Sequence, residues 1–201
     1  MGACTNLSKG RGIDCTRSIG GVKTVYLVSF EYVRNLTVVD RFVTYFSVVP
    51  EDRGGHEGSS KSYIYQIHLP KRGGSVVEVI NADVNSPTKA VYYSQGLTIH
   101  LDKLDACTQT LLRQLGESKL MAFVVLNQLN TTGQNKIVLL GETNGLRLNS
   151  GSGTSGDKWS SHNGYEWILT GEEKKPMPMM HDLENYEWAN SRNIIDYCYG
   201  Y

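Results

Sequence analysis

The chain has 201 residues, a length that suits one domain or one domain with extended arms. Its 20 Lys and Arg residues balance 20 Asp and Glu residues, so the formal net charge is zero. A protein that grips nucleic acid phosphates normally carries a basic surplus, and this composition therefore disfavours direct nucleic acid binding. Zero net charge also removes long-range self-repulsion, which permits dense self-association.

The amino-terminal third predicts an arm followed by two long strands. Residues 1–21 are polar and glycine-rich, which indicates an irregular arm. Segments 22–33 and 37–49 are rich in β-branched and aromatic residues, with Asn35 in the turn between them. In the first segment both alternating faces are apolar. We therefore expect this strand to be covered on both sides, by its own core or by a neighbouring subunit.

Six further strands are predicted, separated by turn residues such as those of 50–60. Their spacing is typical of an all-β sandwich or barrel. The predicted strands are Val22–Val33 and Thr37–Val49 as above, then Ser62–Leu69, Ser75–Ile80, Val91–Leu101, Leu120–Leu126, Ile137–Gly141 and Tyr165–Thr170.

One helix is predicted, over about 103–115, with Asp102 or Asp105 as its N-cap. Gly116 should end it in the left-handed conformation. An apolar stripe at helical spacing should pack on the face of a sheet. The stripe consists of Leu104, Cys107, Leu111, Leu112 and Leu115.

Two polar or aromatic segments complete the organisation. Residues 144–164 are rich in Gly, Ser, Asn and Thr and predict a flexible loop, in which Trp159 needs a pocket within the chain or on a neighbour. The tail 179–201 is dense in aromatic residues and should dock, within the chain or across an interface. The fold prediction is therefore mainly β (α+β): an antiparallel β-sandwich or half-barrel over 22–178, with one flanking helix and extended arms.

No arrangement of residues points to a metal, a cofactor or an enzyme. The cysteines lack the close pairs that deliver zinc ligands, and no two histidines share a metal-binding spacing. Free thiols of a protein assembled in a reducing cytoplasm are the preferred interpretation. The glycine loops precede strands and so lack the helix N-terminus that cradles phosphate. No secretory signal or apolar run long enough to span a bilayer is visible, so no membrane role is expected.

Three stretches of the sequence carry a family pattern. They are GIDCTRSIGGVKTVYLVSF, YYSQGLTIHLDKLDACTQTLLRQL, and GETNGLRLNSGSGTSGDKWSSHNGYEWILTGEEKKPMP. They resemble, in turn, the amino-terminal region, the strand–helix unit and the closing segment of tail tube proteins from tailed bacteriophages. The resemblance covers most of residues 10–178 as a general pattern, whereas 179–201 match no pattern of that family.

The resemblance implies a structural virion protein without catalytic activity, located in the tail and assembled in the host bacterial cytoplasm. Six copies would form a ring, rings would stack into a tube, and hairpins would line a channel through which double-stranded DNA passes without sequence-specific binding. The strands 22–33 and 37–49 would supply such a hairpin. Sheath, tape-measure and head–tail connector proteins are the further partners that the resemblance implies.

A channel that passes DNA should carry acidic or neutral side chains, because basic ones would hold phosphates. The candidate lumen-facing residues are Asp40, Glu51, Asp52 and Glu57. The candidate contacts between subunits are the aromatic residues Tyr26, Phe30, Trp159, Trp188 and Tyr199.

Three alternatives remain open at the level of sequence. The first is a head–tail completion protein of the same virion, which forms rings that do not stack. The second is a β-sandwich carbohydrate-binding module that stacks sugars on aromatic rings. The third is a thiol enzyme that uses Cys15 or Cys107, although Cys107 falls on the apolar stripe and favours a buried, inert thiol. The sugar platform would consist of Tyr63, Tyr65, Tyr92 and Tyr93.

Overall fold

The computed structural model describes residues 19–48, 64–70, 73–82, 90–130, 132–159, 161–180 and 194–196. Twelve strands, one α-helix and one 3-10 helix lie within them. They are β1 Val22–Ser29, η1 Phe30–Tyr32, β2 Val33–Val39, β3 Phe42–Val48, β4 Ile64–His68, β5 Gly74–Ala82, β6 Val91–Asp102, α1 Ala106–Gly116, β7 Leu120–Leu129, β8 Asn135–Leu140, β9 Arg147–Thr154, β10 Gly164–Glu173, β11 Met179–Met180 and β12 Ile194–Asp196.

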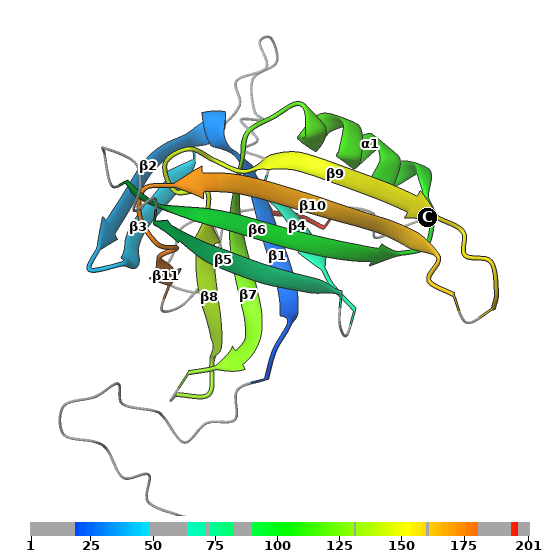
Figure 1. Ribbon diagram of the computed structural model, residues 1–201, viewed down its shortest axis with the longest axis horizontal. Coiled ribbons are helices and arrows are strands. Elements are labelled where there is room, and N and C mark those ends of the chain that lie inside the picture. The colour runs from blue at the N-terminus through cyan, green and yellow to red at the C-terminus, as the bar shows by residue number, and fades with distance from the viewer. Residues whose placement is uncertain are drawn as a thin grey trace, which may run out of the picture.

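The strands form two packed sheets, which confirms the predicted mainly β sandwich with one flanking helix. The large sheet has the order β12-β4-β1-β7-β8-β11-β3-β2, and the small sheet has the order β5-β6-β10-β9. The small sheet is antiparallel throughout, whereas the large one contains two parallel pairs, β11 with β3 and β12 with β4. The small sheet lies across the strands β1, β7 and β8 at a steep angle, and α1 lies beside β9 (Figure 1).

Strand β1 is buried on both faces, as its sequence predicted. Val25 and Leu27 belong to the core between the two sheets, and Tyr26 and Val28 belong to a second core on the other face of the large sheet. Residues of β3, including Phe46, close that second core, because the large sheet curls over on itself. The chain's own core therefore covers β1, in the manner of a half-barrel.

The predicted hairpin of 22–33 with 37–49 is wrong in its register. The strand from Val22 ends at Ser29, and β1 pairs with β4 and β7. The hairpin is instead β2 with β3, and its turn lies at Asp40 and Arg41, both at positive φ (49° and 65°). Two consecutive residues at positive φ match the twist of a tight hairpin, and Asp tolerates this conformation better than most residues.

Helix α1 confirms one predicted end and corrects the other. Its N-cap is Asp105, whose Oδ1 accepts a hydrogen bond from the Thr108 backbone N–H at 2.6 Å. The helix therefore begins at Ala106, and Leu104 lies outside it, 44% exposed. The predicted left-handed stop at Gly116 is wrong, because Gly116 is still helical and the C-cap residue Glu117 has φ −87°.

The predicted flexible loop 144–164 is corrected in its first half, where Arg147–Thr154 forms strand β9 along β10. Small side chains have low intrinsic strand preference, but the ladder to β10 supplies the backbone hydrogen bonds. Gly164 opens β10 at a point where a Cβ atom would lie 1.9 Å from the Leu101 carbonyl oxygen. Glycine is therefore required at that crossing of the two strands.

A buried carboxylate fixes the end of β10 to the segment after β8. Glu173 is 2% exposed, and its Oε1 accepts hydrogen bonds from the backbone N–H groups of Thr143 and Asn144, at 3.0 and 2.7 Å. Gln95 of β6 reaches the same segment, since its Oε1 accepts from the Gly141 N–H at 3.0 Å. These bonds hold the small sheet at a set position on the large one.

Cys107 corrects the expectation of free thiols, because it is disulfide-bonded. The other cysteines of the sequence are Cys4, Cys15 and Cys198, so its partner lies outside the described residues. Most of the predicted arm 1–21 and most of the aromatic tail 179–201 also lie outside them. Within the described chain, no helix combines the length and apolar character needed to cross a membrane.

Candidate functional site

The small sheet turns one face toward the large sheet and the other away from it. Successive side chains of a strand alternate between faces, and Val76, Leu97 and Leu169 pack inward. The alternate positions form what we call the outer face, and none of them is buried. The outer face consists of Ser75, Val77, Val79 and Asn81 of β5; Tyr92, Ser94, Gly96, Thr98 and His100 of β6; Glu166, Ile168, Thr170 and Glu172 of β10; and Arg147, Ser150, Ser152 and Thr154 of β9.

The outer face is rich in hydroxyl groups and poor in cations. Glu166 and Glu172 lie on β10, in the interior of the sheet, and Arg147 lies on the edge strand β9. No lysine is among the described residues that make up this face. A surface of small hydroxyl side chains and acids binds a nucleic acid backbone weakly, because affinity for phosphate depends mainly on Lys and Arg.

Two histidine–carboxylate pairs lie at one end of the outer face. The His100 Nδ1 atom is 3.3 Å from Glu166 Oε2, and the His162 Nε2 atom is 3.5 Å from Asp102 Oδ1. The centroids of the two imidazole rings are 6.2 Å apart, and the rings are arranged edge to face. Ion pairs between side chains this exposed contribute little to the free energy of folding. No group of three or more His, Cys, Asp or Glu residues within the described chain is placed to hold a metal ion.

The two edges of the small sheet, β5 and β9, have no further strand paired to them among the described residues. The β5 edge is apolar, with Val77 and Val79 of the outer face 53% and 48% exposed. Ile80 and Val91 are also exposed near the end of the β5–β6 hairpin, on the opposite face. An exposed apolar edge strand is a template for pairing with another chain.

Trp159 lies in the turn between β9 and β10 and is fully exposed. The turn is organised around Ser161, whose Oγ donates to Asp157 Oδ1 at 2.5 Å and accepts from the Lys158 N–H at 3.2 Å. These bonds present the indole outward from the tip of the small sheet. No described residue provides the pocket that the sequence led us to expect for it.

The predicted lumen residues are not gathered on this face. Asp40 is exposed in the β2–β3 turn, which belongs to the large sheet, while Glu51, Asp52 and Glu57 lie outside the described residues. Sequence reasoning missed the outer face itself. The alternation of Ser, Gly, Thr and His with buried Gln95, Leu97 and Ile99 was the pattern that could have revealed it.

The predicted aromatic contacts lie in different environments. Tyr26 is 9% exposed, and its hydroxyl accepts a hydrogen bond from Gln66 Nε2 at 3.2 Å. Phe30 is half-buried against the second core. Trp159 is exposed, as described above. Trp188 and Tyr199 lie outside the described residues.

The structure bears on parts of two alternatives, although Cys15 of the proposed thiol enzyme lies outside the described residues. Of the four proposed sugar-stacking tyrosines, Tyr92 and Tyr93 are neighbours in β6 and point to opposite faces, and Tyr65 packs against the core between the sheets. Tyr63 lies outside the described residues. A nucleophilic role for Cys107 requires a thiolate, and the disulfide-bonded Cys107 of the structure does not offer one.

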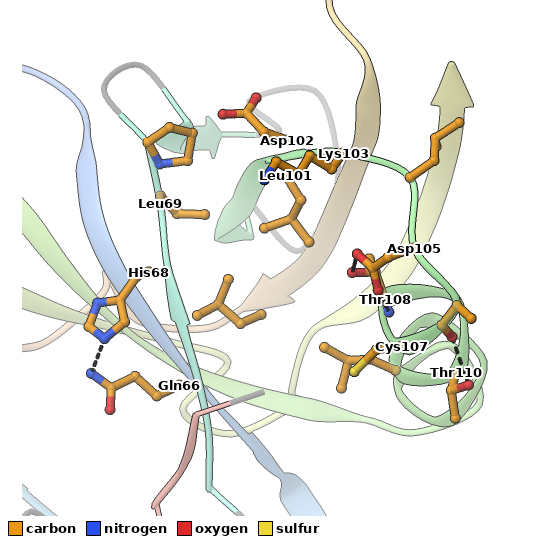
Figure 2. A pocket seen from close by; sticks show the side chains of 15 residues that line it. Gln66, His68, Leu69, Leu101, Asp102, Lys103, Asp105, Cys107, Thr108 and Thr110 are labelled. Atoms are coloured by element: carbon orange, nitrogen blue, oxygen red, sulfur yellow. Dashed lines mark hydrogen bonds between the residues drawn. The ribbon is translucent and has the colours of Figure 1, made fainter. Parts of the chain in front are cut away.

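A pocket of about 1040 Å³ lies between β4, the end of β6 and the start of α1 (Figure 2). Its apolar lining includes Ile67, Leu69, Leu101 and Leu111, and Cys107 also lines it. Polar groups at the pocket are engaged with one another. Gln66 and His68 are bonded through their side chains at 3.0 Å, and the Thr108 hydroxyl donates to Asp105 Oδ2 at 2.7 Å.

No protein-family model and no curated protein matches the chain. Among solved structures, the chain is similar to the SPP1 tail tube, determined by solid-state NMR and cryo-electron microscopy. The alignment covers 82% of this chain and 81% of that one, at 14% identity and a TM-score of 0.37. A score of this size does not by itself establish a common fold.

Proposed function

We propose that this protein is the structural subunit of a bacteriophage tail tube. Copies join through the edges of their small sheets into rings, which are hexameric in the family pattern that the sequence resembles, and rings stack around a channel for DNA. The observation that carries the proposal is a cation-poor sheet face with no buried residue, between two edges to which no described strand is paired. The role is geometric and needs no catalytic group.

The open edges support ring closure. The β5 edge of one copy can pair with the β9 edge of the next, which is a head-to-tail contact. Such a contact closes into a ring when the rotation between copies divides a full turn, and closure removes every free edge of the small sheet. Side chains of the neighbouring β9 strand would then flank the exposed Val77 and Val79 on the channel side of the sheet.

The outer face supports a position toward the channel. Its hydroxyl-bearing residues and its acids Glu166 and Glu172 suit a surface along which DNA slides without being held. This assigns the lumen to the small sheet, in place of the hairpin near Asp40. Trp159, at the tip of the β9–β10 turn, is placed to contact an adjoining ring or a further tail protein.

Negative-stain electron microscopy of the purified chain tests the proposal. Stacked hollow cylinders would support a tail tube subunit. Single discs would favour the alternative, a head–tail completion protein whose rings do not stack. Monomeric particles at high concentration would contradict both.

A matched pair of substitutions tests which edge assembles. Val79 on the β5 edge and Val39 on the β2 edge are similarly exposed, at 48% and 52%, and lie at edges of different sheets. Val79→Lys should abolish cylinders, because it places a charge in the proposed contact, while Val39→Lys should leave them intact. Cylinders from Val79→Lys together with none from Val39→Lys would transfer the contact to the large sheet.

A second pair of substitutions tests whether the outer face of the small sheet lines the channel. Thr170→Lys adds a cation to the outer face, and Gln109→Lys adds one to the exposed side of α1. Short duplex DNA should co-sediment with Thr170→Lys tubes at low salt more than with Gln109→Lys tubes. Equal retention by the two variants would argue against a lumen at the small sheet.

A further inference from the structure

Both ends of the small sheet carry exposed apolar side chains. Strand β6 has 12 residues, of which the first, Val91, is opposite Ala82 of β5 and the last, Asp102, is opposite Gly164 of β10. At about 3.3 Å per residue, the length of this strand places the two ends of the sheet about 36 Å apart. We call the end at Val91 the hairpin end, and the end that carries the turn between β9 and β10 the turn end (Figure 1).

The hairpin end extends beyond the core between the two sheets. On the face that points toward the large sheet, the side chains of Glu78 and Gln95 are bonded to each other at 3.2 Å, and Gln95 is buried. On the same face but closer to the hairpin end, Ile80 and Val91 are 66% and 52% exposed. Two branched apolar side chains therefore remain in water, and their burial by a partner would be favourable.

The turn end presents one large apolar side chain, that of Trp159, which is fully exposed. The turn is attached to the end of β6, because the Lys103 N–H donates a hydrogen bond to the Asn163 carbonyl oxygen at 2.8 Å. The hydrogen bonds of Ser161 described above also fix the turn internally. A tryptophan on an ordered turn loses little conformational freedom when a partner buries it, and tryptophan is enriched among the residues that dominate binding energy.

The exposed charges at the two ends are complementary. The turn end is acidic in balance, with exposed Asp102, Lys103, Asp157, Lys158 and Glu166. The hairpin end is basic in balance, with exposed Glu172, Lys174 and Lys175. The approach of a turn end to a hairpin end therefore brings acids to lysines, whereas the approach of two hairpin ends brings lysines together.

A contact between a turn end and a hairpin end requires two copies, because the ends of one sheet are separated by the full length of β6. In a ring closed through sheet edges, the strands run from one face of the ring to the other. Rotation about the ring axis relates the copies, so all hairpin ends lie on one face and all turn ends on the other. Rings stacked in one orientation then bring turn ends against hairpin ends, and this head-to-tail contact repeats along a tube.

We propose that rings of this protein stack through Trp159 of one copy, which packs against Ile80 and Val91 of a copy in the adjoining ring. We call this the stacking contact. The inference rests on the tail tube function proposed above, and it assigns the contact between rings, as distinct from the edge pairing within a ring. Burial of the indole against the two branched side chains supplies the affinity, and the complementary charges set the orientation.

Two substitutions in the full chain test the stacking contact. Trp159→Ala removes the indole, and Val91→Asp places an acid where the acids of the turn end approach. Both variants should lose the stacked cylinders and retain single discs in negative-stain micrographs, because neither residue lies in the edge strands β5 and β9. Leu129→Asp is the matched control, since Leu129 is an exposed apolar residue of the large sheet outside the stacking contact. It should form cylinders as the wild type does.

Photo-cross-linking identifies the partner of position 159. A phenylalanine analogue that carries a benzophenone replaces Trp159, the assembled protein is irradiated, and the product is digested with trypsin. Mass spectrometry should find peptide 159–174 joined to peptide 73–89, which contains Ile80, or to the start of peptide 90–103, which contains Val91. A cross-link to peptide 104–113, which borders the pocket beside α1, would overturn the assignment.

Failure of the stacking contact and failure of the tail tube function give different results. Cylinders from both Trp159→Ala and Val91→Asp would overturn the stacking contact and leave the tail tube function standing. Loss of cylinders in Leu129→Asp as well would also overturn the assignment, because the effect would not be specific to the two ends. Monomers from the wild-type chain would overturn the tail tube function and the stacking contact together.

Discussion

The two sheets differ at their edges, and the difference separates folding from assembly. The large sheet has β12 paired on its β4 edge, so a late segment of the same chain covers it. Among the described residues, no strand covers β5 of the small sheet in this way, and Val77 and Val79 are exposed there. On the function proposed above, the β4 edge is completed within the chain and the apolar β5 edge is completed by a second copy.

The largest expected effect distinguishes the two faces of the small sheet. Trp167 and Ile168 are neighbours in β10, but Trp167 is 1% exposed in the core whereas Ile168 lies on the outer face. Trp167→Ala should lower the free energy of unfolding by about 3–5 kcal/mol, because it opens a cavity between the sheets. Ile168→Ala should cost less than about 1.5 kcal/mol. Urea unfolding followed by circular dichroism measures both, and equal losses would mean that the outer face is packed.

The next effect concerns the crossing of β6 and β10. A Cβ atom at Gly164 would lie 1.9 Å from the Leu101 carbonyl oxygen, whereas one at Gly96 would have no neighbour closer than 3.9 Å. Gly164→Ala should therefore cost about 1–3 kcal/mol through forced strand separation. Gly96→Ala, the matched control, should change stability by about 0.5 kcal/mol or less. Thermal unfolding measures the stability of both variants. An unchanged stability of Gly164→Ala would contradict the close approach of β10 to the Leu101 carbonyl oxygen.

A smaller effect is expected at the helix that borders the pocket. Asp105 caps α1 through its bond to the Thr108 N–H. Asp105→Ala should destabilise the chain by about 1 kcal/mol, and Asp105→Asn should retain most of that stability, because its side-chain oxygen still accepts the bond. Chemical denaturation measures the two values. Equal losses in both variants would show that the cap hydrogen bond is not the source of the effect.

The smallest effect on stability belongs to the open edge. Val79→Lys should change the free energy of unfolding by no more than about 0.5 kcal/mol, because the side chain is already half exposed. The same variant should prevent assembly. A stability loss as large as that of Trp167→Ala would mean that Val79 supports the fold, and its assembly defect could then not be assigned to the edge.

Much of the fold could be predicted from sequence because β1 is a nearly continuous apolar run and apolar alternation is strong in β6 and β10. The hairpin turn could not, since two central residues at positive φ at Asp40 and Arg41 leave only a weak mark in composition. Strand β9 was missed for a different reason. Its Ser and Gly residues carry little strand preference, and only the ladder to β10 orders them.

The candidate site was harder to predict than the fold. Its outer face joins strands from 74–82, 91–102, 147–154 and 164–173, so no single window of sequence contains it. The bonded state of Cys107 could not be read from cysteine spacing either, because disulfide partners are chosen by proximity in the folded chain. Both features depend on contacts between distant segments.

The double burial of β1 has a consequence for biosynthesis. Its neighbours are β4 and β7, and β7 begins only at Leu120. Roughly 90 residues separate the end of β1 from that point, and a ribosome needs on the order of 5–20 s to add them. During that interval the neighbouring strand β7 is not yet available to pair with the nascent β1 segment, which is apolar on both faces. A holdase chaperone that binds short apolar stretches should therefore raise the yield of soluble protein more for this chain than its modest hydrophobic content would suggest.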